Sequence, residues 1–253
     1  MPISLFNLRG LRDAAADLML GSSCPGCHAP GWGLCEACRE LLPSKPHRLV
    51  RPGWQPASQR PDQVSMPPAI ATGWYREPLS SIIIAHKDDG AWQLAHQLGG
   101  LLALSIAGLV PQDRTGLKEQ RARSPGVVLV PVPSDQVAVR RRGYDHSRAL
   151  ASAAGRRLGL SVVPLLIRSR TAHDQVGRGR DARLASQSGT MQALNASSRP
   201  VIVTDDLVTT GATIVEAVRA LRAAGCQVQG IAVIGDTPKR ATGGLRSADH
   251  PDE

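Results

Sequence analysis

The sequence predicts an α/β protein with a mostly parallel central sheet, preceded by a small cysteine-rich module. Short apolar runs recur at 127–133, 162–167, 201–203 and 228–234, and segments with helical spacing lie between them. Aromatic residues make up only 3% of the chain although 42% of it is hydrophobic, so the core must be aliphatic. With 253 residues the chain is long enough for one α/β domain and a small appendage.

Charge and hydropathy restrict the ligands and the compartment. The formal net charge of +9 favours anionic ligands such as pyrophosphate or nucleic acid, although diffuse Arg-rich surface charge explains it equally well. No apolar run approaches the roughly 18 residues of a membrane-spanning helix, and Asp13 and Asp17 interrupt the N-terminal apolar stretch. We therefore expect a cytoplasmic protein without membrane insertion.

Two closely spaced cysteine pairs mark the N-terminal part of the chain. Residues 4–20 place leucines at nearly helical spacing and predict a short amphipathic helix, and the pattern C-x2-C-x7-C-x2-C follows. Two such pairs can place four thiolates tetrahedrally around Zn²⁺, which a reducing compartment favours over disulfides; a redox-active pair is the alternative. We expect residues 1–42 to form this helix and a structural zinc module, with the ligands Cys24, Cys27, Cys35 and Cys38.

Prolines separate this module from the body of the protein. Because proline lacks a backbone donor and disfavours helix, the proline-rich residues 43–69 are predicted to be a linker, with Trp54 holding one point of it. Residues 70–237 carry the strand and helix patterns of the main domain. Residues 238–253 are polar and without periodicity, so we expect a disordered tail.

The main domain opens with a predicted strand and two helices. Residues 71–76 predict the strand, Pro78 suits the start of a helix that ends at Lys87, and a second helical run spans about 91–108. At the end of its helix, Lys87 suits a contact with the helix dipole.

An arginine cluster follows the strand predicted at 127–133. Arg140, Arg141 and Arg142 precede Gly143, and a helix then runs to about residue 158. Open α/β sheets bind ligands at the carboxyl ends of their strands, and Arg donates paired hydrogen bonds to phosphate. The alternative is a solvated basic turn.

An acidic pair follows the apolar strand at 201–203. Asp205 and Asp206 come where that strand should end, and a helical pattern begins at Ile214. Two carboxylates there suit the hydroxyl groups of a ribose or an associated Mg²⁺. A helix N-terminus attracts phosphate through its unpaired N–H groups and its partial positive charge. The predicted ligand is a sugar phosphate, because the GxxxxGK[ST] motif of triphosphate loops is missing.

The turn between this strand and its helix is rich in hydroxyl groups. Gly211 allows close approach of the backbone to a ligand, and the flanking threonines offer hydrogen-bond donors. The alternative is an ordinary strand–helix turn, in which Thr213 and Glu216 have capping-box spacing. The predicted phosphate-binding residues are Thr209, Thr210, Gly211, Ala212 and Thr213.

Segment 205–213 resembles the 5-phosphoribosyl 1-pyrophosphate (PRPP) signature of type I phosphoribosyltransferases. More narrowly, the chain resembles the ComF family of competence-associated, ComFC/GntX-like proteins over roughly residues 20–236, through the ordered motifs at 24–38, 75–87, 131–147, 175–183 and 205–213. The resemblance implies a type I phosphoribosyltransferase-like fold. It also implies that Mg²⁺–PRPP loses pyrophosphate as a nucleophile attacks C1 of the ribose.

The same resemblance assigns roles to individual residues. Asp205 and Asp206 would be the catalytic carboxylates that hold the ribose hydroxyls, and residues 209–213 would bind the 5′-phosphate. Residues 171–188 would form a loop that closes over PRPP. The remaining PRPP-binding residues would be Lys87, Arg140, Arg141 and Arg142, which face the pyrophosphate, and Arg183 in that loop.

This chain departs from the ComF pattern at several positions. Tyr144, Asp145 and His146 replace the usual F-N-Q, and Ser186 stands where Asn is usual. No residue identifies the acceptor substrate. Two alternatives to an enzyme therefore stay open: an accessory protein of natural transformation that binds single-stranded DNA or DNA-uptake proteins, and a PRPP-sensing regulator without turnover.

Overall fold

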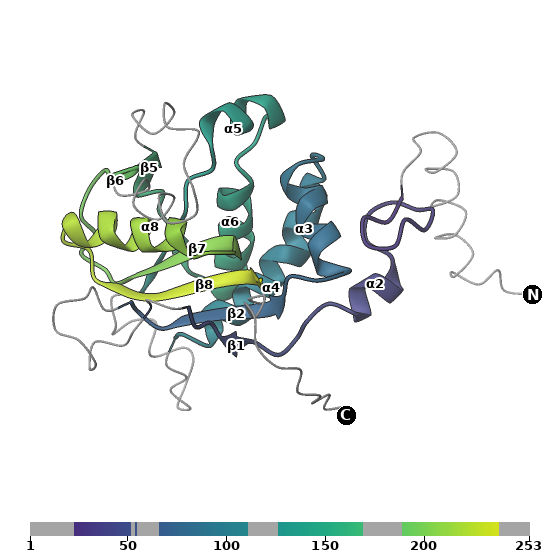
Figure 1. The fold of residues 1–253 in the computed structure, drawn as a ribbon, viewed down its shortest axis with the longest axis horizontal. Coiled ribbons are helices and arrows are strands. Elements are labelled where there is room, and N and C mark those ends of the chain that lie inside the picture. Colours follow the sequence, from purple (N-terminus) through teal and green to yellow (C-terminus); the bar gives the residue numbers. More distant parts are fainter. Residues whose placement is uncertain (1–22, 52–53, 55–65, 111–125, 169–188, 238–253) are drawn as a thin grey trace, which may run out of the picture.

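The computed structural model describes residues 23–51, 54, 66–110, 126–168 and 189–237, which build a six-stranded sheet. Its strands are β1 (His47–Arg48), β2 (Ala69–Trp74), β3 (Val128–Pro131), β4 (Ser161–Val162), β7 (Val201–Val208) and β8 (Val228–Asp236). They lie in the order β1-β2-β8-β7-β3-β4, and every pair is parallel except β1 with β2 (Figure 1). The predicted α/β class and mostly parallel sheet are confirmed.

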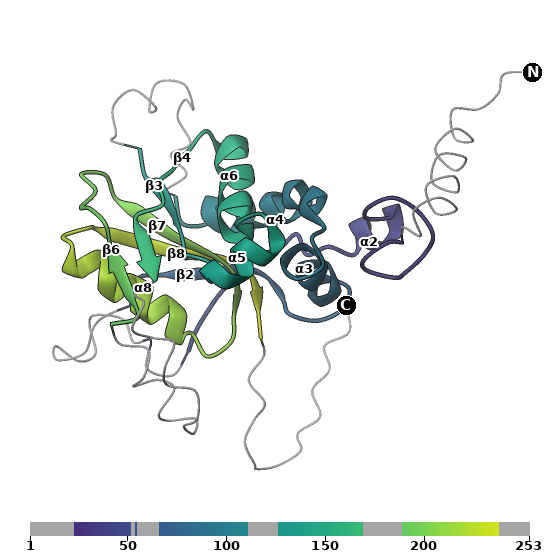
Figure 2. The ribbon, with the colours of Figure 1, turned by 90° about the horizontal axis from the view of Figure 1, so that it is seen from above.

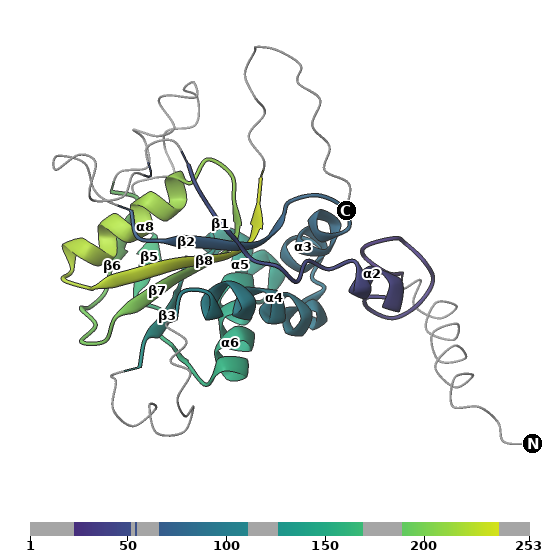
Figure 3. The same cartoon turned by 90° about the horizontal axis from the view of Figure 1, so that it is seen from below.

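Helices cover both faces of the sheet because successive strand residues point to opposite sides. Val201 and Val203 share a buried cluster with α8 (Ala212–Ala223) on one face, and Ile202 shares another with the helices opposite. Figures 2 and 3 show α8 on one side of the sheet and α4 and α6 on the other. The helices opposite α8 are α3 (Leu79–Lys87), η1 (Trp92–Leu94), α4 (Ala95–Ala107) and α6 (His146–Leu158).

The strand predicted at 201–203 is longer than expected. The apolar pattern predicts its end before Asp205, but β7 continues through both carboxylates to Val208. Its neighbour β8 runs alongside it to Asp236, and Val208 pairs with that residue. Continued backbone pairing therefore outweighs the low strand propensity of aspartate.

The single strand predicted at 162–167 is wrong. Val162 ends β4, Pro164 interrupts the pairing, and a separate strand begins at Leu166. This second strand, β5 (Leu166–Arg168), pairs antiparallel with β6 (Met191–Ala193) in a two-stranded sheet of its own. Strand β6 was not predicted, because its three residues are too few to show a periodic pattern.

The arginine cluster lies in a short helix that was not predicted. Asp135 accepts hydrogen bonds from the N–H groups of Val137 and Ala138, and so caps α5 (Gln136–Arg142). The three arginines form the last turn of α5, which Gly143 ends at a φ of +80°.

The cysteine-rich segment before the sheet packs against helix α3 of the main domain. Cys24 and Cys38 share a buried cluster with Leu79 of α3, and Figure 1 shows α2 (Glu36–Glu40) and the loop before it beyond α3. Within the predicted linker 43–69, β1 pairs with β2, and Leu49 is buried. The predictions for 4–20, 171–188 and 238–253 lie outside the described residues. None of the described helices has the length and hydropathy that a membrane crossing requires.

Candidate active site

Asp206 is the centre of the candidate site. Its carboxylate is buried in β7, where Lys87 Nζ donates to Oδ2 over 2.8 Å and His146 Nε2 lies 3.4 Å from the same oxygen. Burial alone would raise the pKa of Asp206, but the hydrogen bond from His146 and the charge of Lys87 outweigh it. Together they hold that pKa well below its ordinary value, so this carboxylate is ionised at neutral pH.

The neighbouring carboxylate has the opposite tendency. Asp205 Oδ1 accepts a hydrogen bond of 2.9 Å from the backbone N–H of Asp206. Burial and then the negative charge of Asp206 raise the pKa of Asp205 well above its ordinary value. The acidic pair therefore holds one firmly ionised carboxylate beside one that binds a proton much more readily.

Lys87 reaches the acidic pair from the end of α3. Burial alone would lower the pKa of this ammonium, but the charge and hydrogen bond of Asp206 raise it, so the group stays protonated. About a third of the side chain, 36%, is exposed. Lys87 therefore neutralises Asp206 and remains accessible to an anion.

The three predicted arginines differ in exposure. Arg142 turns inward with a side-chain exposure of 7%, and its guanidinium donates to the backbone carbonyl of Lys87 and to that of Ala138. It thereby satisfies a carbonyl that the end of α3 leaves unpaired. Arg140 and Arg141 are exposed, so only these two of the cluster are open to a ligand. Arg183 lies outside the described residues.

Asp145 and His146, which stand where the ComF pattern has Asn and Gln, support Asp206 through a series of polar contacts. Asp145 caps α6, since it accepts from the N–H of Arg148, and it also accepts from Ser134 Oγ over 2.7 Å. Ser134 Oγ lies 3.0 Å from His146 Nδ1, and the other ring nitrogen of His146 faces Asp206. A chain of polar contacts thus fixes the imidazole against the ionised carboxylate.

The turn after β7 opens α8 through a glycine. Gly211 is the N-cap residue with a φ of +84°, and a Cβ there would lie 2.5 Å from the ring of Trp54. Only glycine meets both demands. Thr209 and Thr210 are exposed, while Thr213 is half-buried in the first turn of α8. The predicted phosphate-binding residues therefore form one continuous loop and helix start directly after the acidic strand.

The capping-box alternative for this turn is wrong. Gly211, rather than Thr213, is the N-cap residue of α8. The buried carboxylate of Glu216 accepts from the N–H of Met191 over 3.0 Å and forms an ion pair with Arg219, so it fastens β6 to the helix.

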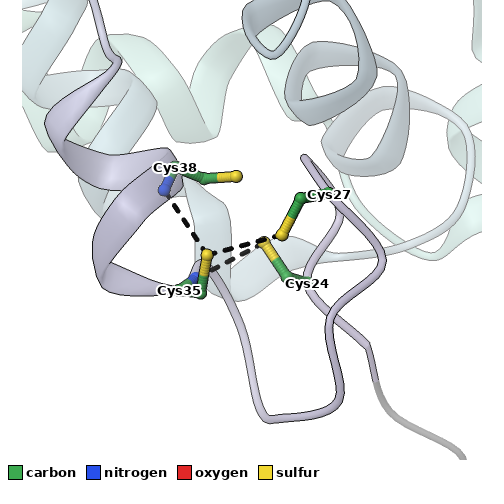
Figure 4. A group of neighbouring side chains, drawn as sticks. All are labelled: Cys24, Cys27, Cys35 and Cys38. Atoms are coloured by element: carbon green, nitrogen blue, oxygen red, sulfur yellow. Dashed lines mark hydrogen bonds between the residues drawn. The ribbon is translucent and has the colours of Figure 1, made fainter.

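The four N-terminal cysteines form one cluster. Their sulfur atoms all lie within 4.8 Å of one another (Figure 4). All five cysteines of the chain are described and none forms a disulfide. Burial would raise the pKa of the Cys24 thiol, but the N–H groups of Cys35, Cys27 and Gly26 lower it to about 6. Four sulfurs this close together are a donor set that suits Zn²⁺, and backbone N–H groups that donate to Cys24 Sγ and Cys35 Sγ help to stabilise thiolates there.

Sequence reasoning missed one buried ion pair beside the loop. Arg51 and Asp236 pair with side-chain exposures of only 4% and 3%. Arg51 falls within the predicted linker, where neither spacing nor periodicity marks it. Asp236 ends β8 two residues beyond the predicted strand. Only the folded chain brings the two together.

Comparisons with known proteins leave the family open. No protein-family model and no curated protein matches the chain. Among solved structures, it is similar to one titled "Structure of the allosteric regulatory enzyme of purine biosynthesis", with 18% identity and a TM-score of 0.35. The match covers 56% of this chain and 26% of that one, so the chain spans about a quarter of that protein.

Proposed function

We propose that this chain is a cytoplasmic, PRPP-binding, phosphoribosyltransferase-like protein of the ComF type. One observation carries the proposal: an ionised carboxylate, held by Lys87 and His146, lies directly before a glycine-capped helix start. A phosphoribosyl group presents vicinal hydroxyls beside a 5′-phosphate. The acidic strand and the loop after it offer acceptors and donors in the matching order.

The two halves of the site would divide the substrate between them. Asp206 and Asp205 accept hydrogen bonds from the ribose hydroxyls. The backbone N–H groups and hydroxyls of residues 209–213 bind the 5′-phosphate. Substrate binding would dissociate part of the Lys87–Asp206 pair, and the ribose hydroxyls would replace the lost hydrogen bonds.

The leaving group would lie on the basic side of the site. Lys87, Arg140 and Arg141 neutralise the pyrophosphate as the bond to C1 of the ribose breaks and an acceptor attacks that carbon. Mg²⁺ would arrive with PRPP and share this role. Arg142 is engaged with the end of α3, so we assign it to supporting Lys87.

Calorimetric titration with PRPP, with and without Mg²⁺, tests this function. We expect micromolar binding by the wild type and a loss of at least about tenfold, or 1.4 kcal/mol, in Asp206→Asn. Asp89→Asn is the matched control because it removes the same charge from an exposed residue near Lys87. Pyrophosphate release during an acceptor screen then separates an enzyme from a regulator that only binds PRPP.

Two outcomes would count against the proposal. If the folded wild type does not bind PRPP, the loop at 209–213 is not a PRPP site and the proposal is wrong. Equal losses of PRPP affinity in Asp206→Asn and Asp89→Asn would show that net charge alone, and not the position of Asp206, causes the effect.

We propose a structural Zn²⁺ for the cysteine cluster. The buried Cys24 and Cys38 pack beside α3, so loss of the metal should loosen this contact. We expect about one zinc per chain by mass spectrometry of the metal, and less in Cys27→Ser, whose cysteine is exposed. Full metal content in this variant would contradict the four-cysteine set.

A second candidate function is binding of single-stranded DNA. Trp32 and Trp92 are 51% and 67% exposed, and Trp32 borders a hollow of about 550 Å³ between the cysteine module and α3. These rings would stack on bases, and the net charge of +9 would attract the phosphate backbone. DNA affinity that falls steeply with salt and is lost in Trp32→Ala would support this function.

A further inference from the structure

Arg51 lies behind the loop that follows β7. Its Nε donates to the carbonyl oxygen of Thr209 over 3.0 Å, and NH2 donates to that of Val208 over 3.1 Å. The same NH2 group contacts Asp236 Oδ1 and lies 3.2 Å from the carbonyl oxygen of Thr237. One buried guanidinium thus joins the ends of β7 and β8.

The carbonyl contacts determine which way the loop presents its donors. A trans peptide is planar, and its N–H points away from its C=O. Holding the carbonyls of Val208 and Thr209 toward Arg51 therefore turns the N–H groups of Thr209 and Thr210 to the opposite side. A loop that must bind an anion needs its N–H groups, not its carbonyls, on the ligand side.

Asp236 keeps the guanidinium in place. Its buried carboxylate pairs with Arg51, and its other oxygen lies 3.4 Å from His47 Nε2. The ring of His47 stacks on Trp74 with centroids 4.3 Å apart. Asp236 balances the charge of the Arg51 guanidinium, and backbone carbonyl groups accept its remaining hydrogen bonds. Arg51 is therefore not free to bind a phosphate itself.

The same segment also contacts the start of α8. The N–H of Trp54 donates to the carbonyl of Arg51 over 2.9 Å, and its ring lies against Gly211. Residues 51 and 54 therefore hold both ends of the turn between β7 and α8.

We propose that Arg51 is a positioning residue that pre-organises the loop at 208–211 for a phosphate. The inference rests on the proposed function, in which this loop binds the 5′-phosphate. It assigns Arg51, which lies within the predicted linker, to the support of the site.

The test separates loop geometry from fold stability. Arg51→Met alone leaves Asp236 buried without its partner and destabilises the fold directly. The double variant Arg51→Met/Asp236→Asn removes both charges and keeps an acceptor for His47. Ribose 5-phosphate probes the loop, and inorganic pyrophosphate probes Lys87, Arg140 and Arg141.

We expect the double variant to keep a cooperative melting transition, to bind ribose 5-phosphate at least about tenfold more weakly and to bind pyrophosphate within about twofold of the wild type. Amide hydrogen exchange at 209–213 should be faster, while exchange in Val203 is unchanged. Unchanged affinity for ribose 5-phosphate would overturn the role of Arg51, as would equal losses for both probes. A wild type that does not bind ribose 5-phosphate would overturn this inference and the proposed phosphate site together.

Discussion

Two carboxylate–cation pairs lie near the carboxyl edge of the sheet, and they differ in access to solvent. Asp206 on β7 pairs with Lys87, whose side chain is 36% exposed. Asp236 on β8 pairs with Arg51, and both are almost fully buried. The open pair can exchange its partner for a ligand, whereas the buried pair can only hold the backbone around it. Similar charges thus serve binding at one strand and positioning at the next.

Breaking the buried pair should have the largest effect on stability. Arg51→Met strands the Asp236 carboxylate in the interior, and we expect a loss of about 3–5 kcal/mol in the free energy of unfolding. Lys87→Met should cost about 1–2 kcal/mol, because the Lys87 side chain is 36% exposed and water can take its place beside Asp206. Urea denaturation of both variants measures the difference. Equal losses of unfolding free energy in the two variants would contradict the distinction between an open and a buried ion pair.

Gly211→Ala should have the next largest effect. A φ of +84° costs an alanine about 1–2 kcal/mol, and its Cβ would also strike the Trp54 ring. We expect a loss of about 2–3 kcal/mol in stability and weaker binding of ribose 5-phosphate. Adding Trp54→Ala should relieve the clash but leave the backbone strain, so recovery should be partial. Full recovery in the double variant would show that φ is unstrained there.

The two neighbouring aspartates should respond oppositely to substitution. Asp205 has a raised pKa, so its ionisation above the ordinary carboxyl pKa opposes folding, and Asp205→Asn should stabilise the chain at neutral pH. Asp206 has a lowered pKa and stabilises the fold above its ordinary pKa, so Asp206→Asn should destabilise it. We expect shifts of about 2–4 °C in Tm for each 1 kcal/mol.

The pH dependence sharpens this prediction. The advantage of Asp205→Asn should be greatest at neutral pH and should vanish as the pH falls below about 4, the ordinary carboxyl pKa. The deficit of Asp206→Asn should be complete above about pH 4 and should shrink only below it, where the unfolded chain binds a proton that the folded Asp206 does not. Thermal melts from about pH 3 to about pH 8 check both trends. Shifts of the same sign for both variants would contradict the different roles of the pair.

Local pattern was enough to predict part of this site. The order of strand, acidic pair, hydroxyl-rich turn and helix is written in consecutive residues, and so is the cysteine spacing. Sequence also placed Lys87 at the end of its helix. Pro164, which divides β4 from β5, is visible in the sequence, but the apolar run continues on both sides of it and therefore suggests a single strand.

The contacts that complete the site could not be predicted from sequence. Lys87 and Asp206 are 119 residues apart in the chain, and Arg51 and Asp236 are 185 apart. Neither pair has a spacing rule, since tertiary packing alone brings its members together. The inward turn of Arg142 has a similar cause: the unpaired carbonyls of α3 compete for its guanidinium, and the sequence does not show that α3 is near.

A crystal structure of the chain with Mg²⁺ and PRPP would test the account most directly. We predict the 5′-phosphate within hydrogen-bonding distance of the N–H groups of residues 209–213, and the ribose hydroxyls at Asp205 and Asp206. Arg51 should keep its contacts with Asp236 and with the carbonyls of Val208 and Thr209. PRPP bound elsewhere, or bound with Arg51 turned onto its phosphate, would contradict the division between the open and the buried pair.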